Sequence, residues 1–432
     1  MVEGRASEGM AGRGPLAGLT VVDCSTVLAG PYCTMLLGDL GADVLKVEPP
    51  EGDATRSWGP PWVGEVAAGT RTAAYYLAIN RNKRSLRLDL RRDAGRAVLW
   101  RLLERADVVV ENFRVGGFEK LGFSDAALQA LNPGLVHLAV SGFGTTGPDA
   151  PKPGYDFVIQ AVSGLMSITG EPDGRPLKVG VAISDVVTGL FGAVAILGTL
   201  VGRQRSPKPS RDVVRDGGAG GDGAGGDRSG TRIDVSLLES TLAVLINQAQ
   251  NAFVTGRAPG RRGNAHPNIV PYETFSTTDG EIAVGVGSER QWARFCEALG
   301  LAELASDARF ATNGARVEHR TELIPLLGAR FAQAPTVTWL ARLDEAGIPC
   351  GPILDVLEAF DSPQARAVEA RVPTRHPGLG AVDQVASPYR LNGERGGVRL
   401  APPLLGEHSR EILAEAGFDP AEIERLATAG VI

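Results

Sequence analysis

The chain has 432 residues, of which 43% are hydrophobic and 22% are charged. These proportions are those of an ordinary soluble globular protein that is long enough for two domains. The net charge of −6 argues against nucleic acid as the main partner and against a basic membrane-binding surface. The cysteines and histidines are scattered, without the spacing of a disulfide framework or a metal site. This pattern predicts a protein of the reducing cytosol that binds no metal.

The N-terminus lacks the apolar segment of a signal peptide, so residues 1–14 are expected to form a disordered tail. The apolar run at 186–201 is shorter than a bilayer span. We therefore expect a soluble, cytoplasmic protein that does not associate with membranes.

Short apolar strands alternate with helices through the first half of the chain. Strands are predicted at 19–23, 43–48, 85–90, 108–111 and 135–141, and helices from Pro31 to Gly41 and at 93–106, 123–132 and 186–201. Strand–helix–strand units at this spacing are typical of a parallel sheet. Residues 15–205 are therefore predicted to form a large, open, Rossmann-like α/β domain.

The composition changes at 206–230, which is rich in Pro, Gly and Asp and is predicted to be a flexible linker or insertion. Further strands (231–235, 282–286) and helices (236–255, 289–299, 320–333, 335–346) then predict a smaller α/β domain over 231–345. Residues 346–432 form a C-terminal segment that ends in helices at 407–417 and 420–429.

Asp185 is the single charge between Lys178 and Arg203, at the start of an apolar helix. Burying a carboxylate costs several kcal/mol unless a partner compensates it. One interpretation is a helix cap, which the local pattern favours. The other is a nucleophile or base that the helix N-terminus keeps ionised.

Three other stretches have a structural and a functional interpretation. The GFGTTG run at 142–147 follows a strand, but prolines follow it, so no dinucleotide-binding helix can begin there. It is either a turn or a place where a ligand approaches the backbone. The basic run at 80–92 is either a solvated strand or a phosphate-binding patch. Glu111, Asn112 and Phe113 end a strand, where an amide and a ring could hold a planar base.

Several segments in this order and spacing resemble the family III coenzyme A transferases of the CaiB/BaiF type. They are PLAGLTVVDCSTVLAGPYCTMLLGDLGADVLKVE, NRNKRSLRLDL, ADVVVENFRVGGFEKLGF, the GYD…SGL…TG…SD block, GNAHPNIVPYETF and APPLLGEHSREIL. They run from residue 15 to the C-terminus, and the 206–230 stretch is the main part without a counterpart. Members of this family are similar in fold to alpha-methylacyl-CoA racemase.

The resemblance implies a homodimer of two interlocked chains, each with a large Rossmann-like domain, a small domain and a C-terminal segment that returns to the large domain. It places the catalytic aspartate of the family on Asp185. That carboxylate attacks the donor thioester, giving an aspartyl anhydride, then an aspartyl-CoA thioester, from which an acceptor acid takes the CoA. No permanent cofactor is implied, because CoA thioesters are the substrates.

For CoA binding, the resemblance points to Val27, Leu28 and Ala29, to Asn112 and Phe113, and to Lys120 near the phosphates. Where some relatives carry an arginine for CoA, directly after Glu48, this chain has Pro49.

The resemblance also leaves a racemase or epimerase as an alternative, and a non-catalytic CoA-binding protein as another. Racemases of this group place a histidine before Asp156, where this chain has Tyr155, a poor base at neutral pH. Glu289 does match a glutamate of the racemase pattern. The segments are most similar to the branch that moves CoA from succinyl-CoA to dicarboxylic acids. Such an acceptor needs a cation, for which Arg56, Lys178 and Arg290 are candidates.

Overall fold

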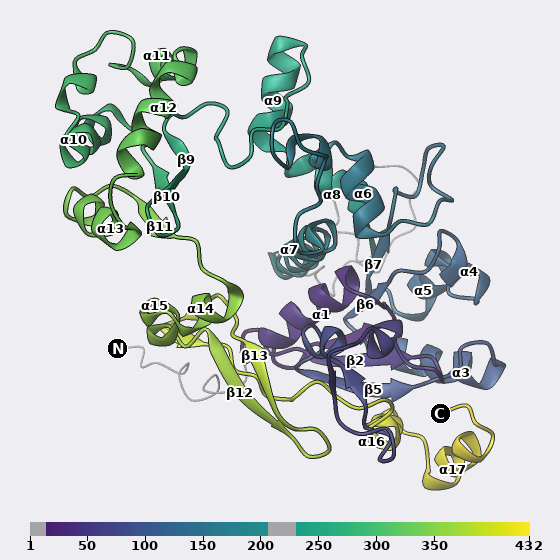
Figure 1. The fold of residues 1–432 in the computed structure, drawn as a ribbon. Helices are drawn as coiled ribbons and strands as arrows, with labels where there is room; N and C mark the ends of the chain where they lie inside the picture. The colour runs from purple at the N-terminus through teal and green to yellow at the C-terminus, as the bar shows by residue number, and fades with distance from the viewer. Residues whose placement is uncertain (1–13, 206–229) are drawn as a thin grey trace, which may run out of the picture. The chain divides into compact units, whose positions relative to one another are not determined.

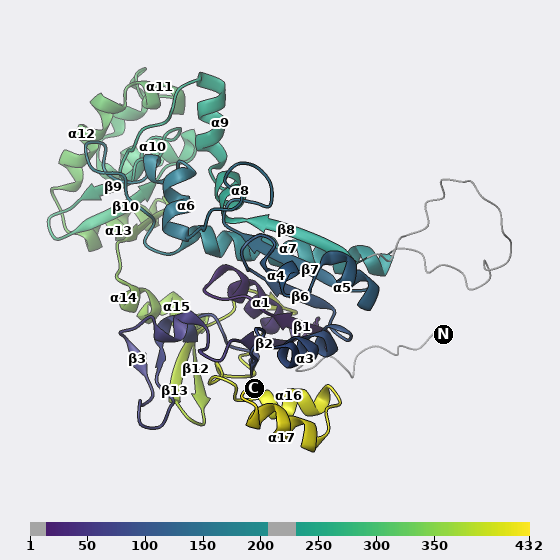
Figure 2. The ribbon, with the colours of Figure 1, turned by 90° about the vertical axis from the view of Figure 1, so that its right-hand side faces the viewer.

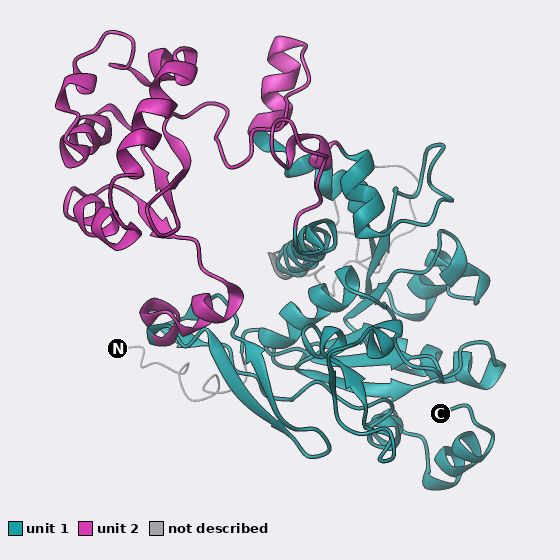
Figure 3. Ribbon diagram, viewed as in Figure 1, with its two compact units in different colours: residues 1–163, 180–246, 367–432 teal, residues 164–179, 247–366 magenta. Residues whose placement is uncertain are grey.

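A computed structural model describes residues 14–205 and 230–432 (Figure 1). The predicted tail at 1–14 and the predicted insertion at 206–230 lie almost wholly outside these residues and stay predictions. The described chain forms two compact units (Figure 3). Unit 1 comprises the described residues up to 163 together with 180–246 and 367–432, and unit 2 comprises 164–179 and 247–366.

Unit 1 is built on one sheet of six described strands, all parallel, in the order β5-β2-β1-β6-β7-β8. The strands are β1 (Thr20–Asp23), β2 (Asp43–Glu48), β5 (Lys83–Arg87), β6 (Val108–Glu111), β7 (Val136–Ser141) and β8 (Thr231–Ser236). Numbered along the sheet in chain order, this is 3-2-1-4-5-6, the doubly wound Rossmann order. The predicted parallel α/β fold is therefore confirmed.

Helices cover both faces of this sheet, because successive residues of each strand point to opposite sides. On β1, Val21 belongs to a core that includes side chains of α1 and α7, whereas Val22 belongs to a core on the other face that includes side chains of α3 and α16. The helices of this unit are α1 (Ala29–Asp39), α2 (Ala74–Leu77), α3 (Asp93–Leu103), α4 (Gly117–Lys120), α5 (Asp125–Leu131), α6 (Asp156–Val162), α7 (Ile183–Arg205), α8 (Leu237–Ala243), α16 (Ser409–Glu415) and α17 (Pro420–Thr428).

The chain division differs from the predicted one at three places, the third being residues 346–366, which were predicted to return to the large domain but belong to unit 2. Residues 231–235 were predicted to open the small domain, but β8 pairs with β7 along its whole length and completes the large sheet. The boundary instead falls inside α9 (Ile246–Thr255), and residues 164–179 belong to unit 2. The long helix predicted at 236–255 is broken into α8 and α9, because Ile246 has a φ of 38°, which a continuous helix does not allow.

The C-terminal segment does return to unit 1, from residue 367 onward. Ile412 and Leu413 of α16 pack into the same core as β1 and α3. Figure 2 shows α16 below α3. Asn82 accepts hydrogen bonds from the backbone N–H groups of Arg399 and Leu400, so the returning chain is fastened beside the start of β5. Short antiparallel pairs complete the unit: β3 (Trp62–Val63) with β4 (Thr72–Ala73), β12 (Arg371–His376) with β13 (Gly380–Val385), and β14 (Arg390–Leu391) with β15 (Glu394–Arg395).

Unit 2 has its own core, in which aromatic side chains such as Trp292, Phe331 and Trp339 are buried. Its antiparallel sheet has the order β11-β10-β9. Its elements are α9, β9 (Tyr272–Ser276), β10 (Glu281–Gly285), α10 (Glu289–Leu299), α11 (Asn313–Glu318), α12 (Arg320–Phe331), α13 (Thr336–Glu345), β11 (Cys350–Pro352), α14 (Val356–Asp361) and α15 (Pro363–Ala367).

Helix α7 is longer than the apolar run predicted. Over Ile183–Arg203 its mean hydropathy is 1.8, so by length and composition alone it could cross a membrane, and 28% of its apolar window is buried. One side packs closely on α1, where a side chain at Gly189 would collide with the carbonyl oxygen of Ala29 at 2.7 Å. Ala193 and Ile196 are buried in the core with Leu138. These contacts place one side of α7 in the core of unit 1.

Candidate active site

The carboxyl ends of β1 and β6 lie side by side at the point where the strand order reverses. In open α/β sheets ligands bind in the crevice outside the strands at such a switch point. Here β1 leads into the loop 24–28, and β6 leads into Asn112 and Phe113. The loop and the pair of side chains therefore occupy the position where this fold binds its ligands.

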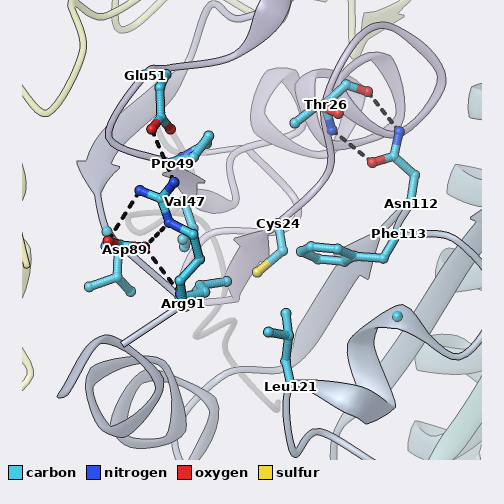
Figure 4. Close-up of a pocket in the computed structure, with 13 residues that line it drawn as sticks. Cys24, Thr26, Val47, Pro49, Glu51, Asp89, Arg91, Asn112, Phe113 and Leu121 are labelled. Atoms are coloured by element: carbon cyan, nitrogen blue, oxygen red, sulfur yellow. Dashed lines mark hydrogen bonds and ion pairs between the residues drawn. The ribbon is translucent and has the colours of Figure 1, made fainter. Parts of the chain in front are cut away.

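A cavity of about 440 Å³ opens at this edge (Figure 4). Asn112 bridges its two walls, because its side chain accepts a hydrogen bond from the N–H of Thr26 (2.9 Å) and donates one to the carbonyl oxygen of Thr26 (2.7 Å). The ring of Phe113 points into the space between Cys24 and Leu121. The cavity is lined by Cys24, Thr26, Val47, Pro49, Glu51, Leu88, Asp89, Leu90, Arg91, Asn112, Phe113, Gly117 and Leu121.

A second cavity of about 290 Å³ shares Thr26, Asn112 and Phe113 with the first. It differs from the first in containing Asp185 and two basic residues, Arg114 and Lys152. Its lining consists of Thr26, Val27, Ala29, Asn112, Phe113, Arg114, Val115, Val140, Ser141, Gly142, Ala150, Pro151, Lys152, Pro153, Gly154, Tyr155, Asp185 and Leu237. A long ligand could therefore run from one cavity into the other past Thr26 and Asn112.

The second cavity has glycine at two facing positions, Gly142 and Gly154, because neither position has room for a side chain. A side chain on Gly142 would lie 2.6 Å from the α-carbon of Gly154, and one on Gly154 would lie 2.5 Å from that of Gly142. The glycine-rich run 142–147 thus serves a close approach of two backbone segments. In the described structure, the next helix after this run is α6, which begins at Asp156. This agrees with the exclusion of a dinucleotide-binding motif, which requires a helix directly after the glycines.

Asp185 lies in the first turn of α7 and is 9% exposed. Burial, and after it the negative charge of Asp156, raises the pKa of Asp185 to about 7, while a hydrogen bond from the backbone N–H of Ala29 acts in the opposite direction. Ala29 begins α1, so the carboxyl group of Asp185 lies at the N-terminus of α1 as well as at that of its own helix.

One of the two interpretations of the sequence was that the N-terminus of α7 keeps Asp185 ionised, but in the structure an N–H group of that N-terminus binds another carboxylate. Asp156 Oδ1 accepts the hydrogen bond of the Ser184 N–H at 2.8 Å. An N–H group of the first turn that could have stabilised the Asp185 anion is thus used by another carboxylate, whose own charge opposes ionisation. The N–H of Ser184 is therefore capped by Asp156 and not by Asp185.

A buried polar network holds the loop 24–28 that faces Asp185. Lys46 and Asp53 form an ion pair of 2.9 Å with both side chains completely buried. Lys46 donates to the carbonyl oxygen of Ser25, and Asp53 accepts from the N–H of Val27. Val27 has a φ of 71°, a strained conformation for a β-branched residue that persists only where its surroundings enforce it.

The predicted CoA-binding residues fall into two groups. Val27, Ala29, Asn112 and Phe113 line the cavities described above, together with Asp185. The other two do not line either cavity: Leu28 is buried at the start of α1, and Lys120 is exposed at the end of α4, between the lining residues Gly117 and Leu121.

Sequence reasoning missed Lys46 and Asp53 in this site, and it named Asp156 only as a position of the racemase pattern, without a link to Asp185. A charged residue inside an apolar strand, as Lys46 is in DVLKVE, was the available signal for the buried pair. The contact of Asp156 with Ser184 has no local signal, because it spans 28 residues of sequence.

The basic run at 80–92 is mainly structural. Lys83 is fully buried and pairs with Asp23 at 3.0 Å, and Arg81 pairs with Asp39 at 2.6 Å. Arg91 is the basic residue of this run that lines a cavity, where it is paired with Asp89 and Glu51. Most of the positive charge is thus already neutralised inside the fold.

Of the candidates for binding a distal carboxylate, Arg56 is in the same unit as Asp185 but does not line its cavity. Arg56 is held by two hydrogen bonds to Glu48 and lies over the ring of Tyr76, 3.7 Å from its centre. Lys178 and Arg290 belong to unit 2. Arg114 and Lys152, which the sequence did not single out, line the cavity that contains Asp185.

Glu289, the glutamate that matched the racemase pattern, has structural partners. Its carboxylate accepts hydrogen bonds from Arg316 (2.8 Å) and from the N–H of Asn313 (2.7 Å). Arg316 is completely buried. Glu289 therefore neutralises a buried cation in unit 2.

Comparison with known proteins agrees with this geometry. A model of CoA-transferase family III matches residues 16–211 and 223–409. The succinate–glutarate CoA-transferase of Agrobacterium fabrum is 40% identical over 415 residues, which cover 96% of this chain and 98% of that protein. The succinyl-CoA:glutarate CoA-transferase of Mus musculus is 38% identical over 420 residues, covering 97% and 90%.

The fold has a matching relative among solved structures. The crystal structure of a CaiB/BaiF family protein from Brucella suis is 42% identical to this chain, with a TM-score of 0.77, and the match covers 94% of this chain and 100% of that one. Both sequence and fold thus match over nearly the whole length. The chain belongs to CoA-transferase family III and is a CoA-transferase.

Proposed function

We propose that Asp185 carries out CoA transfer as a covalent nucleophile. Its carboxylate attacks the carbonyl carbon of the donor thioester, the C–S bond breaks, and CoA leaves as a thiolate with the bonding electron pair. The thiolate then attacks the Asp185 carbonyl of the mixed anhydride, which releases the donor acid and leaves an aspartyl-CoA thioester. The acceptor carboxylate repeats both steps in reverse order and regenerates free Asp185.

The observation that carries this proposal is a buried carboxyl group in the wall of a cavity at the ligand-binding edge of the sheet. A pKa of about 7 leaves about half of the Asp185 carboxyl groups ionised at neutral pH. A carboxylate of raised pKa is also a stronger nucleophile than an ordinary aspartate. Its burial supports the mechanism further, because mixed anhydrides hydrolyse in water.

CoA occupies both cavities in this proposal. The nucleotide lies in the larger cavity with its base against Phe113, and Lys120 and Arg91 lie near the phosphates. The pantetheine arm passes Thr26 and Asn112 and brings the thioester to Asp185. The shared lining residues Thr26, Asn112 and Phe113 support this path.

The donor is succinyl-CoA and the acceptor a dicarboxylate, such as glutarate. This assignment is supported by the names of the two CoA-transferases with 40% and 38% identity. A dicarboxylate has a second charge that must be neutralised inside the site. Arg114 and Lys152 are the basic residues of the Asp185 cavity and take this role in place of Arg56.

The protein acts as a homodimer in the cytoplasm. Large apolar side chains are exposed along α6, α7 and α9, among them Phe157, Val194 and Phe253, which are 57%, 66% and 78% exposed. Exposed apolar surface of this kind marks protein–protein contact. The cysteines are free, as in a reducing compartment.

The test is to trap the intermediate. The protein is incubated with succinyl-CoA, treated with hydroxylamine and digested, and the expected product is a hydroxamate on Asp185, identified by peptide mass. Asp185→Ala should abolish both labelling and transfer, whereas Asp93→Asn, which removes an exposed carboxylate at the start of α3, should retain both. Transfer that survives in Asp185→Ala would refute the proposal.

A further inference from the structure

Asp156 is a charged residue of the site that the transfer mechanism leaves without a role. It begins α6 and is half-buried, and its two carboxylate oxygens have different partners. Oδ1 accepts from the N–H of Ser184, and Oδ2 accepts from the side-chain amide of Gln160, each at 2.8 Å. Ser184 directly precedes Asp185, so these two bonds fix a second carboxylate at the helix turn that carries the nucleophile.

The other charged and titratable groups near Asp185 do not neutralise this pair of carboxylates. Helix α1 contributes one hydrogen bond to Asp185, which the N–H of Ala29 donates. From α2 there is Tyr75, whose pKa is raised to about 12 by burial and by three carboxylates, that of Asp185 first, so this hydroxyl is uncharged at working pH. Asp53 is already paired with Lys46.

The two cations that line the same cavity, Arg114 and Lys152, are on exposed segments, and Lys152 is paired with Asp149 at 2.6 Å. The described surroundings of Asp185 thus contain a second negative charge and no buried cation beside it. This is an unusual choice for a site whose only task would be to bind an anion, since opposite charges would serve that better.

We propose that Asp156 is a positioning residue that caps α7 in place of Asp185 and whose negative charge favours the acylated, uncharged form of Asp185. This inference rests on the proposed nucleophilic role of Asp185. When Asp185 attacks the thioester, its negative charge is lost to the anhydride and appears on the departing CoA thiolate. The repulsion from Asp156 is relieved in that step, and it returns when Asp185 is released as a carboxylate.

The experiment compares Asp156→Asn with the natural protein. Asparagine keeps an oxygen that accepts the Ser184 N–H and removes the charge, but its NH2 group replaces the oxygen that accepts from Gln160, so a small fall of the thermal midpoint is expected. The acid limb of the pH profile of kcat/KM for succinyl-CoA, expected near pH 7 from the pKa of Asp185, should move down by roughly one pH unit. At pH 8.5, where Asp185 is ionised in both proteins, the rate of acylation should fall roughly threefold, because a less basic carboxylate is a weaker nucleophile.

The resulting crossover, with the variant faster near pH 6 and slower at pH 8.5, is a signature that loss of structure does not produce. Asp93→Asn, at the exposed start of α3, is the matched control and should keep the natural profile, which separates the effect from a general change of charge. Asp156→Glu should restore the natural profile at least in part. An unshifted acid limb in Asp156→Asn, with Asp185 still labelled by hydroxylamine, would overturn this inference and leave the proposed function standing. Failure to label Asp185 in the natural protein would instead overturn the proposed function.

Discussion

Lys46 and Asp53 form an ion pair of 2.9 Å in which neither side chain has any exposure, and Lys46→Met tests what that pair contributes. Methionine fills similar space but leaves Asp53 buried without its cation. Breaking a buried pair from one side costs about 3–5 kcal/mol of unfolding free energy. Lys46 also lowers the pKa of Asp23 and donates a hydrogen bond to Ser25, so the loss should lie towards the upper end of that range.

The assay is urea unfolding followed by circular dichroism, with the free energy of unfolding compared between variants. Lys152→Met is the control, because its pair with Asp149 is exposed at 61% and 45% and should contribute no more than about 1 kcal/mol. The double variant Lys46→Met/Asp53→Asn should recover about half of the loss or more, since no unpaired charge then remains. At sub-denaturing urea, KM for the acyl-CoA should also rise in Lys46→Met, because the loop 24–28 loses a fastening point.

One result would refute this reasoning. If Lys46→Met costs no more than Lys152→Met, the burial of the pair has no energetic consequence, and the loop is held by other contacts. A double variant that is less stable than Lys46→Met would contradict it too, because it would mean that Asp53 contributes most through bonds to neutral groups.

Three further predictions concern acid stability, Glu289 and the 206–230 stretch. Although burial opposes it, Lys83 and a second buried lysine lower the pKa of Asp23 to about 2. Ionised Asp23 therefore stabilises the fold above its unfolded pKa of about 3.9. This contribution should disappear between roughly pH 4 and 2, which the urea midpoint measures. Glu289→Gln should lower the stability of unit 2 by about 1–3 kcal/mol while leaving kcat for CoA transfer within about twofold, and a large loss of kcat would contradict its role as partner of Arg316. Deleting 210–228 should leave transfer largely intact, and loss of folding on expression would contradict that expectation.

The strands of unit 1 could be predicted from the sequence because each is a short β-branched run between turn residues. Five of the six were located to within a few residues, and the parallel order follows from the helical connections. The sixth was found but assigned to the wrong unit, because the Gly-rich stretch at 206–230 separates it from the strands before it. A change of composition marks an interruption of the chain, and an interruption inside a domain has the same local pattern as a linker between domains.

The candidate site, like the fold, could be predicted only where the signal lies within one stretch of sequence. Asp185 could be recognised because a lone carboxylate in an apolar helix is conspicuous in one stretch of sequence. The side chains that determine its state, Asp156 and the loop fastened by Lys46 and Asp53, come from other parts of the chain, and a sequence pattern does not pair them.

The contacts of Asp156 with α7 bear on how a carboxylate in the first turn of a helix should be interpreted. The usual inference is that it caps its own helix and is therefore ionised. In α7 the cap comes from Asp156, so Asp185 is buried without the donors that a cap would have, and its pKa rises instead of falling. Whether such a carboxylate is a structural cap or a reactive group therefore depends on which residue accepts the N–H bonds of the first turn, and that contact is made across the fold.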